Sequence, residues 1–400
     1  MGNLIAITWA LSPLTGWGKV GLALHARLAT RGDVPLLLSP PSPEAFPPEQ
    51  AAALMALHAP VAPVLPFLVN HPDQQVTLSP AVMLHAFGND LGCDETLLRA
   101  VGSHRVGLAA IENTRIAPAR VDRARAFDTM VVHSRFNRDL LAAHGLTNLA
   151  LTYQGIDPTL FHPRPATGRF GDRFVVFSGG KVEYRKGQDL VVAAFARFAA
   201  RHPDTLLVCA WASFWPDLAY GVNDGVLARP LVAAGDGRPD IRRWLAENGV
   251  PAANALVLDH YTPAELAALL PDCHVALFPN RCEGCTNLVA METMAAGVPT
   301  LLSANTGHLD LLDAGCGVAL TTQHALPDPD GQRQGWGESD VDEMVARLEE
   351  AHARHAQWRA AAVPAAATIA RRTWDRFAAV TLAAAETGDP GEPGLLIPEE

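Results

Sequence analysis

The chain has 400 residues, of which 49% are hydrophobic and only 18% charged, so it can bury the cores of two ordinary domains. Its formal net charge of -11 argues against nucleic acid as a partner, because contacts to a phosphate backbone need a basic surface. An acidic chain can still hold a small basic pocket, so anionic small molecules stay open as ligands.

Cysteine usage and hydropathy favour a cytoplasmic protein without a transmembrane segment. The six cysteines lie in apolar or motif-like runs rather than in a disulfide framework, which suits a reducing compartment. The N-terminal stretch MGNLIAITWA lacks a basic region, so we expect no signal peptide. Pro60, Pro63 and Pro66 interrupt the most apolar window and make it a poor membrane span.

In the first part of the chain, short apolar runs rich in β-branched residues alternate with helical patterns. Two of the helical patterns, GKVGLALHARLATRG and RFNRDLLAAHG, end at glycine, as helices often do. The expected strands are LIAITWA (4–10), VPLLLSP (34–40), VMLHAF (82–87), RVGLAAIE (105–112), DTMVVHS (128–134) and LALTYQG (149–155).

The alternation restarts after a polar break, HPRPATGRFGDR (162–173), that has the composition of an interdomain linker. A helix is expected near 187–201, with strands at FVVFSGG, TLLVCAW, ALVLDH, HVALFPN and PTLLSA. Continuous apolar strands indicate parallel sheets covered by helices on both faces. We therefore predict an α/β fold of two doubly wound domains, at 1–165 and 166–370, with a further helix and a loose tail at 371–400.

A glycine-rich stretch, GWGKVG (16–21), follows the first expected strand and matches the dinucleotide-binding pattern. The loop from Trp9 to Gly16 is longer than that fold needs, and the second strand ends without an acid to hold a ribose. We prefer a loop in which Gly16, Gly18 and Lys19 face an anion. The alternative is that these glycines merely allow a turn.

Lysine is rare in this chain and occurs only at Lys19, Lys181 and Lys186. Two of the three lie in SGGKVEYRKGQDL, between a strand and a helix, where Gly179 and Gly180 let the backbone approach a ligand. Two ammonium groups beside a helix N-terminus make a plausible diphosphate clamp. The alternative is a pair of solvated surface lysines.

Two glutamates stand out in NRCEGCTNLVAMETMAAGVP (280–299). Glu283 is expected in a strand-to-helix loop, and Glu292 inside the helix that Thr286 or Asn287 caps. A carboxylate accepts two hydroxyls at once, so both glutamates suit the diols of a ribose or a sugar.

The same stretch contains a Cys-x-x-Cys pair, Cys282 and Cys285. A structural zinc site needs four ligands and this pair supplies two, while a thioredoxin-like pair would lie in the first βαβ unit. We expect these cysteines to be small packing residues, and we expect no metal site.

Glu-Gly-x-x-Asn, followed by a helix with Glu-x-Met-Ala-x-Gly-x-Pro, resembles the family-4 type retaining glycosyltransferases of the GT-B fold. The segment GGKVEYRKG is similar to the phosphate loop of that family, with Lys181 in place of an arginine. Further likenesses extend over nearly the whole chain: DTMVVHSRFNRDLLAAHGL, YQGIDPTLFHP, the segment IENTRIAP with Glu112 and Pro118, and Trp374 in a late helix.

The resemblance implies a nucleotide-diphosphate sugar as donor, bound mainly to the second domain, and no essential metal or other cofactor. It implies that Glu292 holds the ribose, and that Lys181, Lys186 and Gly180 hold the diphosphate. Glu283 and His85 would act beside the transferred sugar. The backbone amides of Thr286, Asn287 and Leu288 would bind phosphate or sugar, and the backbone of Val257 and Leu258 would line the base pocket.

One departure from the family pattern concerns the spacing of the two glutamates. The family separates them by seven residues, whereas eight lie between Glu283 and Glu292. We expect a one-residue bulge before the helix to absorb the extra residue. The alternatives to a transferase acting on a glycan, lipid or small-molecule hydroxyl are an inactive nucleotide- or sugar-binding protein and a nucleotide-sugar epimerase. No amphipathic helix marks a lipid surface clearly, which leaves peripheral membrane contact open.

Overall fold

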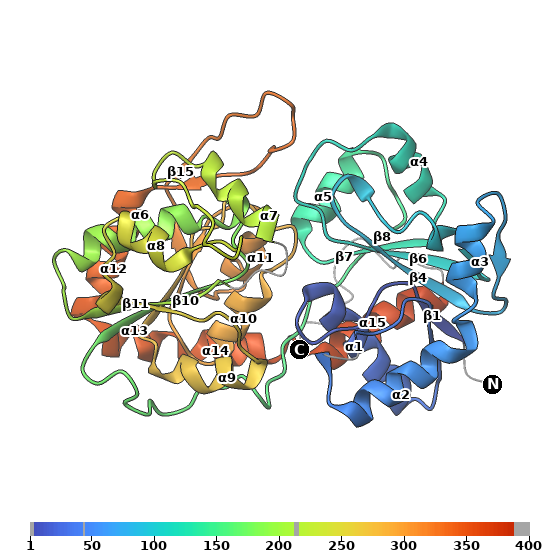
Figure 1. Cartoon of the computed structure of the whole chain (residues 1–400), viewed down its shortest axis with the longest axis horizontal. Helices are drawn as coiled ribbons and strands as arrows, with labels where there is room; N and C mark the ends of the chain where they lie inside the picture. The colour runs from blue at the N-terminus through green and yellow to red at the C-terminus, as the bar shows by residue number, and fades with distance from the viewer. Residues whose placement is uncertain (1–3, 43–44, 212–215, 388–400) are drawn as a thin grey trace. The chain divides into compact units, whose positions relative to one another are not determined.

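The computed structural model describes residues 4–42, 45–211 and 216–387, and the chain divides into two compact units (Figure 1). Unit 1 comprises Met1–Gly155, Pro329–Gln334 and Arg372–Glu400, and unit 2 comprises Ile156–Asp328 and Gly335–Arg371. From residue 388 on, the expected C-terminal tail lies outside the described residues.

Unit 1 is built on a six-stranded parallel sheet with the order β2-β1-β4-β6-β7-β8. A small parallel pair, β3 and β5, stands apart from it. The strands are β1 (Ile5–Ile7), β2 (Pro35–Leu37), β3 (Val76–Thr77), β4 (Val82–Phe87), β5 (Ala100–Val101), β6 (His104–Ala109), β7 (Thr129–Val132) and β8 (Leu149–Leu151).

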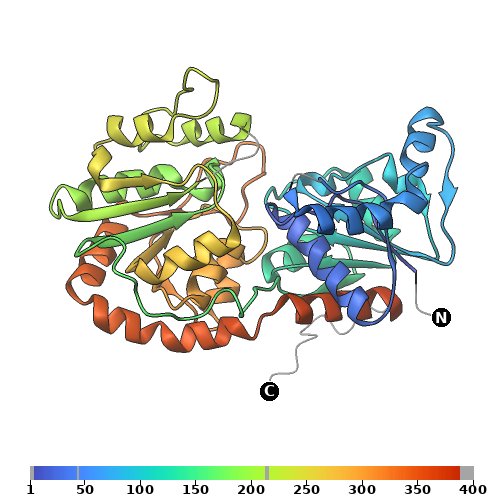
Figure 2. The ribbon, with the colours of Figure 1, turned by 60° about the horizontal axis from the view of Figure 1, so that its bottom comes forward.

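The alternation of side chains along these strands gives the unit 1 sheet two apolar faces. On one face Ile5, Leu84 and Leu108 pack with α1 and α15. The helix α15 runs alongside α1 (Figure 2). On the other face Phe87 and Met130 pack with α4 and α5. The helices of unit 1 are α1 (Gly16–Thr30), α2 (Pro48–His58), α3 (Val64–Asn70), α4 (Pro118–Arg125), α5 (Arg135–Ala143) and α15 (Trp374–Thr387).

Unit 2 has a six-stranded parallel sheet with the order β11-β10-β9-β12-β13-β14, and a short antiparallel hairpin, β15–β16. The order reverses direction between β9 and β12, so these neighbours form the topological switch point of the sheet. The strands are β9 (Phe174–Gly179), β10 (Thr205–Ala210), β11 (Ala255–Val257), β12 (Val275–Phe278), β13 (Thr300–Ser303), β14 (Val318–Leu320), β15 (Gln323–His324) and β16 (Glu338–Ser339).

Both faces of the unit 2 sheet are buried, as continuous apolar strands predict. Val176 and Leu277 face the helices α6, α8 and α12, whereas Phe177 and Phe278 face α9, α10 and α14. The helices of unit 2 are α6 (Gln188–Ala199), α7 (Pro216–Ala219), α8 (Ile241–Glu247), α9 (Pro263–Leu269), α10 (Leu288–Ala295), α11 (Leu309–Leu312), α12 (Val341–Ala353), α13 (His355–Ala361) and α14 (Val363–Ala370).

The prediction of two doubly wound parallel sheets is confirmed. The sequence analysis did not predict β14 or the β15–β16 pair, and β15 and β16 have only two residues each. The chain enters unit 2 at Ile156, ahead of the expected boundary at 165, since Ile156 and Phe161 are buried in the unit 2 core.

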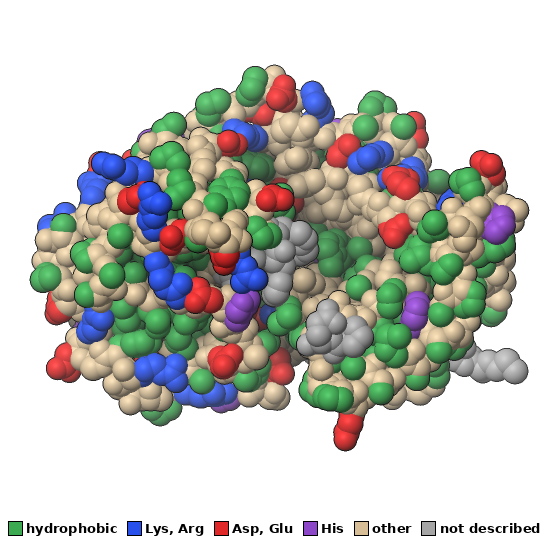
Figure 3. Space-filling model, viewed as in Figure 1, with side chains coloured by type: hydrophobic (Ala, Val, Ile, Leu, Met, Phe, Trp, Pro, Cys, Tyr) green, Lys and Arg blue, Asp and Glu red, His purple; other side chains and the backbone are tan. Residues whose placement is uncertain are grey.

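The surface of unit 2 in Figure 3 intersperses basic and acidic side chains. This agrees with exposed ion pairs such as Arg197–Asp342 and Arg242–Asp259. Among the described helices, none alone has the length and apolar character to cross a membrane. One bent pair, Pro48–Val61 with Val64–Asn70, meets that criterion by length and composition only.

Candidate functional site

The candidate site lies where the carboxyl ends of β9 and β12 meet, at the switch point of the unit 2 sheet. After β9 the backbone turns through Gly180 (φ 109°) and Gly187 (φ 69°), both in conformations that favour glycine. A Cβ at Gly187 would lie 2.3 Å from the carbonyl oxygen of Pro279, which follows β12. Glycine is therefore needed for these two loops to touch.

The loop between Gly180 and Gly187 presents three cations and one carboxylate. Glu183 accepts from Lys181 Nζ at 2.5 Å and from Arg185 Nε at 2.8 Å, so it joins two of the cations. Burial alone would raise the pKa of Glu183, but Arg185 and Lys181 outweigh it and lower the pKa. The Gln188 side chain fixes the loop by donating to the Lys181 carbonyl at 2.9 Å.

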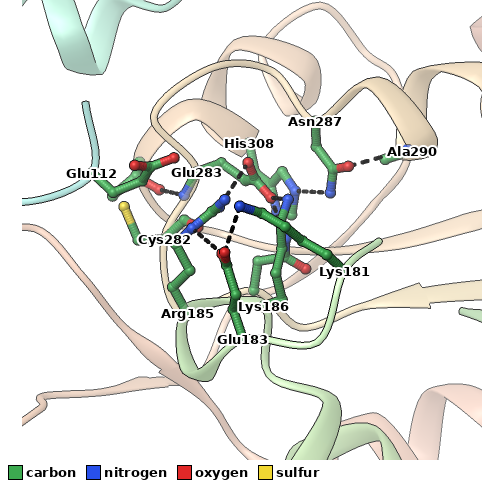
Figure 4. A network of polar contacts seen from close by, with 12 residues as sticks. Glu112, Lys181, Glu183, Arg185, Lys186, Cys282, Glu283, Asn287, Ala290 and His308 are labelled. Carbon is green, nitrogen blue, oxygen red and sulfur yellow. Dashed lines mark hydrogen bonds and ion pairs between the residues drawn. The ribbon is translucent and has the colours of Figure 1, made fainter. Parts of the chain in front are cut away.

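Glu283 joins the second loop to this cluster from its place after β12, as Figure 4 shows. Its carboxylate is buried and contacts Lys186 Nζ, the Asn280 side-chain amide and, at 3.5 Å, Arg185 Nη1. Its backbone N–H donates to Thr306 Oγ1 at 2.8 Å. The loop position predicted for Glu283 is confirmed. Its ion pair with Lys186 was not predicted.

Glu283 and Lys186 form an ion pair in which the two side chains are only 5% and 11% exposed. Burial alone would raise the pKa of Glu283, but the charges of Lys186 and Arg185 lower it to about 2. Burial lowers the pKa of Lys186, while Glu283 opposes that shift. The site therefore holds separated charges in a water-poor setting, where electrostatic interactions with a ligand are strong.

A buried ion pair between Arg281 and Asp189, which the sequence analysis did not predict, stabilises the loop between Gly180 and Gly187. Arg281 donates to both carboxylate oxygens of Asp189, at 2.8 and 2.6 Å, and both side chains are almost fully buried. The Arg281 guanidinium also lies over the Tyr184 ring, 4.1 Å from its centroid, and pairs with Glu338. Because 92 positions separate Arg281 from Asp189 in the sequence, no local pattern could have found the pair.

The N-terminus of α10 faces the same edge of the sheet. Asn287 is the N-cap, with φ 63°, and its side-chain oxygen accepts from the Ala290 amide at 3.4 Å. Thr286 is buried and contacts Met291, and Leu288 is the first helical residue. The first amides of a helix have no acceptor within it, so those of Leu288 and Val289 suit an anion. The extra residue before Glu292 lies in the irregular loop 282–287.

Glu292 lies in the second turn of α10 and is buried. Burial raises the pKa of Tyr261 to about 12, and the nearby charge of Glu292 contributes to this shift. Two backbone groups at the predicted base pocket already have partners: the Leu258 amide donates to Cys209, and the Val257 carbonyl accepts from Arg242.

The glycine-rich stretch of unit 1, expected to be a loop, forms the start of a helix. Gly16, Gly18 and Lys19 lie in the first turn of α1, where Thr15 caps the helix and accepts from the Gly18 amide at 3.1 Å. A Cβ at Gly18 would lie 2.3 Å from the carbonyl oxygen of Ser12. Gly18 therefore allows close packing against Ser12 at the start of the helix. The binding of an anion by Gly16, Gly18 and Lys19 stays a prediction.

His85, which the family resemblance places beside the transferred sugar, is buried in unit 1. His85 lies within β4, 2% exposed, with its ring edge-on to Phe127 at 5.5 Å. Burial, with a smaller contribution from Arg105, lowers its pKa to about 4. The ring thus packs in the core of unit 1, and its contact with a transferred sugar stays a prediction.

Cys282 is buried and Cys285 half-buried, in keeping with packing roles. The Cys285 carbonyl leaves no space for a side chain at Gly307, where a Cβ would lie 1.8 Å away. Within the described ranges, no group of three or more His, Cys, Asp or Glu side chains is placed to hold a metal ion.

Solved structures share this architecture over almost the whole chain. HepE of Anabaena, solved with UDP and glucose, is 14% identical with a TM-score of 0.64, and the match covers 97% of this chain and 99% of HepE. Sucrose-phosphate synthase of Thermosynechococcus elongatus is 15% identical with a TM-score of 0.63, covering 96% of this chain and 98% of the synthase. At these identities the likeness shows the GT-B fold alone.

A curated relative shows sequence similarity over part of the chain. The GDP-mannose-dependent alpha-(1-6)-phosphatidylinositol dimannoside mannosyltransferase of Mycobacterium tuberculosis is 28% identical over 225 residues, which are 56% of this chain and 53% of the relative. The chain thus spans about half the length of the curated relatives it matches. A model of the family 4 glycosyltransferases in conflict systems matches residues 132–380, more than half of the chain. The chain therefore belongs to the family 4 glycosyltransferases found in conflict systems.

Proposed function

We propose that the protein transfers a sugar from a nucleotide-diphosphate sugar to a hydroxyl acceptor, with retention of anomeric configuration. The observation that carries the proposal is the cluster of Lys181, Arg185 and Lys186 at the switch point of the unit 2 sheet. In open α/β sheets this is the place where ligands bind. Family membership supports a nucleotide sugar as the donor.

The diphosphate of the donor would take the place that carboxylates occupy now. Glu183 and Glu283 hold the three cations in position in the described structure. A diphosphate brings more negative charge than one carboxylate and can draw Lys181 and Arg185 away from Glu183. Stabilising the departing diphosphate in this way is the main catalytic contribution that we propose for the cluster.

The remaining site residues would position the nucleoside and the sugar. Glu292, inside α10, would accept the ribose hydroxyls, and the backbone near Val257 and Leu258 would line the base pocket. Glu283 would accept hydroxyls of the transferred sugar and stabilise positive charge at its anomeric carbon. The amides of Leu288 and Val289 would add hydrogen bonds to phosphate or sugar.

We propose that unit 1 binds the acceptor and that no metal is essential. Named relatives act on a glycolipid or were solved with UDP and glucose, so a hexosyl donor is the first to test. The acceptor hydroxyl would belong to a glycan, a lipid or a small molecule. A cytoplasmic location remains a prediction from cysteine usage.

A binding protein without transferase activity is the second candidate, and one observation favours it. Both carboxylate oxygens of Glu283 already have partners, in Lys186, Asn280 and Arg185. If these contacts persist when a donor is bound, Glu283 cannot reach the sugar. The protein would then bind nucleotide sugars and leave them intact.

A nucleotide-release assay separates the two candidates. UDP-, GDP- and ADP-sugars are incubated with the protein, with and without hydroxyl acceptors, and the released nucleoside diphosphate is measured. We expect release from one donor class, faster with an acceptor, lost in Lys181→Met and unchanged in Arg197→Met. Arg197 lies in an exposed ion pair away from the cluster and serves as the control. Binding without release from any donor would contradict the transferase proposal.

A further inference from the structure

His308, in the turn that follows β13, is a fully buried histidine beside the candidate site. Both of its ring nitrogens have polar neighbours: Nδ1 lies 3.0 Å from Ser303 Oγ, and Nε2 lies 3.1 Å from Asn287 Nδ2. Burial lowers the pKa of His308 to about 4, against the opposing charge of Glu283. The ring is therefore neutral near pH 7 and carries one proton.

The hydrogen bonds of Ser303 decide which nitrogen carries that proton. The Ser303 hydroxyl donates its only proton to the Asn280 carbonyl at 2.6 Å. Toward His308 the hydroxyl oxygen can then only accept, so Nδ1 of His308 must be the N–H. It follows that Nε2 of the neutral ring has a lone pair and no proton.

The lone pair on Nε2 in turn decides how the Asn287 side chain is oriented. Its NH2 group donates to Nε2, which directs its oxygen toward the Ala290 amide in α10. Asn287 also has a left-handed backbone, with φ 63°, that a residue with a side chain adopts at a cost. Its cap geometry therefore depends on a partner, and His308 is that partner.

We propose that His308 is a positioning residue, which in its Nδ1–H tautomer holds Asn287 as the cap of α10 and so directs the first amides of the helix at the donor. This inference rests on the proposed function, because it names what positions the phosphate- or sugar-binding end of α10. His308 acts through Asn287 and does not itself touch the donor.

The same turn also supports Glu283, which strengthens the assignment. Thr306 Oγ1 accepts from the Glu283 amide at 2.8 Å, and the Gly307 amide donates to the Glu283 carbonyl at 2.9 Å. The Asn280 backbone carbonyl accepts from Ser303, and the Asn280 side-chain amide donates to the Glu283 carboxylate. One buried network thus positions both the carboxylate and the helix end.

The first test reads the tautomer directly. In the full-length protein labelled with ¹⁵N-histidine, the His308 resonances are assigned by their loss in His308→Gln. We expect the spectrum of a neutral ring protonated at Nδ1, unchanged between pH 6 and 8. A ring protonated at Nε2 would overturn the proposal. This measurement needs no ligand, so its outcome is independent of the proposed function.

The second test measures binding of uridine, guanosine and adenosine diphosphates by calorimetry. His308→Leu removes the acceptor for Asn287, and we expect it to weaken the binding of the preferred diphosphate at least about tenfold. His308→Gln keeps an acceptor and should stay within about threefold of the unsubstituted protein. Equal affinity of the Leu variant would overturn the proposal. Failure of the unsubstituted protein to bind any diphosphate would instead count against the proposed function.

A third variant remains informative even if His308→Leu does not fold. In Asn287→Asp the new carboxylate faces Nε2, and a hydrogen bond requires that nitrogen to gain a proton. The charges that face His308 are those of Glu283, which favours the proton, and Lys186, which opposes it. We expect diphosphate affinity of this variant to fall as pH rises from 6 to 8, while that of the unsubstituted protein stays flat. A flat profile for Asn287→Asp would contradict the proposal.

Discussion

The carboxyl edges of the two sheets are built from different chemistry, although both belong to doubly wound α/β units. In unit 2 the edge carries ionised groups, with Lys186 and Glu283 buried against each other. In unit 1 the corresponding edge is organised by the amide side chains of Asn89 and Asn137, together with the half-exposed Asp90–Arg120 ion pair. Both sheets thus have a carboxyl edge of the same kind, and the residues that line each edge determine which ligands it can bind.

In unit 1, side chains from elsewhere in the unit hydrogen-bond to the backbone of the segment that follows β6. Asn89 Oδ1 accepts the amides of Glu112 and Asn113, at 2.7 and 3.0 Å. Asn137 bonds both the N–H and the carbonyl of Ile111. Thr114 bonds residues 331–334 of the same unit. The segment is thus fixed by side-chain contacts to its backbone, in contrast with the side-chain ion pairs at the unit 2 edge.

Buried histidines show the same contrast between the units. In the described part of unit 1, the Nε2 atoms of His85 and His133 have no hydrogen-bond partner, and burial lowers each pKa to about 4. In unit 2, both nitrogens of His308 have partners. We infer that the unit 1 rings are exchangeable packing residues, whereas the ring of His308 is not.

The largest expected effect comes from breaking the buried charge pair in unit 2. Lys186→Met leaves Glu283 buried without its main partner, and we expect a loss of about 3–5 kcal/mol in the free energy of unfolding. The double variant Lys186→Met/Glu283→Gln should recover most of it. Arg197→Met, at an exposed pair, should cost less than about 1 kcal/mol. Denaturant unfolding measures all three, and a cost for Lys186→Met like that of the control would contradict the comparison.

Acid should destabilise the protein through its buried neutral histidines. Such a histidine has a pKa of about 4 in the folded protein and near 6.5 in the unfolded protein. At pH values between these two, the ring is protonated only in the unfolded state. Stability is therefore lost as pH falls from 6.5 toward 4, by up to about 1.4 kcal/mol per pH unit for each such ring.

His85→Phe isolates one of these rings. We expect unfolding free energies near those of the unsubstituted protein at pH 7, and a loss on acidification that is shallower by up to about 1.4 kcal/mol per pH unit. Denaturant titrations at pH 7, 6 and 5 measure the slope. Parallel slopes for the two proteins would show that His85 does not titrate as its burial indicates.

Glycine at the contact of the two unit 2 loops should be required for stability. In Gly187→Ala the added methyl would clash with the carbonyl of Pro279, and alanine would have to adopt a left-handed backbone. We expect the free energy of unfolding to fall by about 2–3 kcal/mol. The control is Gly168→Ala, which has φ 75° and no atom within 4 Å of the added methyl. The control should cost about 1 kcal/mol. Equal losses in denaturant unfolding would show that the loop contact is not tight.

The smallest effect is expected at the amide-built edge of unit 1. Asn89→Ala frees the amides of Glu112 and Asn113, which should lower the free energy of unfolding by about 1–2 kcal/mol. Asn89→Asp keeps the accepting oxygen and should cost less. Diphosphate affinity, measured by calorimetry, should not change in either variant. A loss of affinity in Asn89→Ala would contradict the division of roles between the edges.

Local sequence patterns predicted the two sheets because buried parallel strands are continuous apolar runs of β-branched residues. The rarity of lysine located the unit 2 cluster, since few positions in this chain could supply ammonium groups. The glycine pattern at Gly16–Gly21 did not indicate that this stretch begins a capped helix. The short sequence match around His85 did not indicate that the ring is buried.

Other site residues could not be predicted because their roles depend on tertiary contacts. Arg281 meets Asp189 only when β12 lies next to β9, and His308 meets Asn287 only across the end of the sheet. Neither residue belongs to a recognisable local motif. The ion pair of Glu283 with Lys186 likewise depends on where the two loops lie in space.

The central claim, that the unit 2 cluster binds the diphosphate of the donor, is tested most directly by calorimetric titration of uridine, guanosine and adenosine diphosphates. Lys181→Met is the test variant, because Lys181 is partly exposed and its loss leaves the buried pair intact. We predict that one diphosphate binds the unsubstituted protein and Arg197→Met equally, and Lys181→Met at least about tenfold more weakly. Equal binding by all three proteins, or no binding of any diphosphate, would contradict the claim.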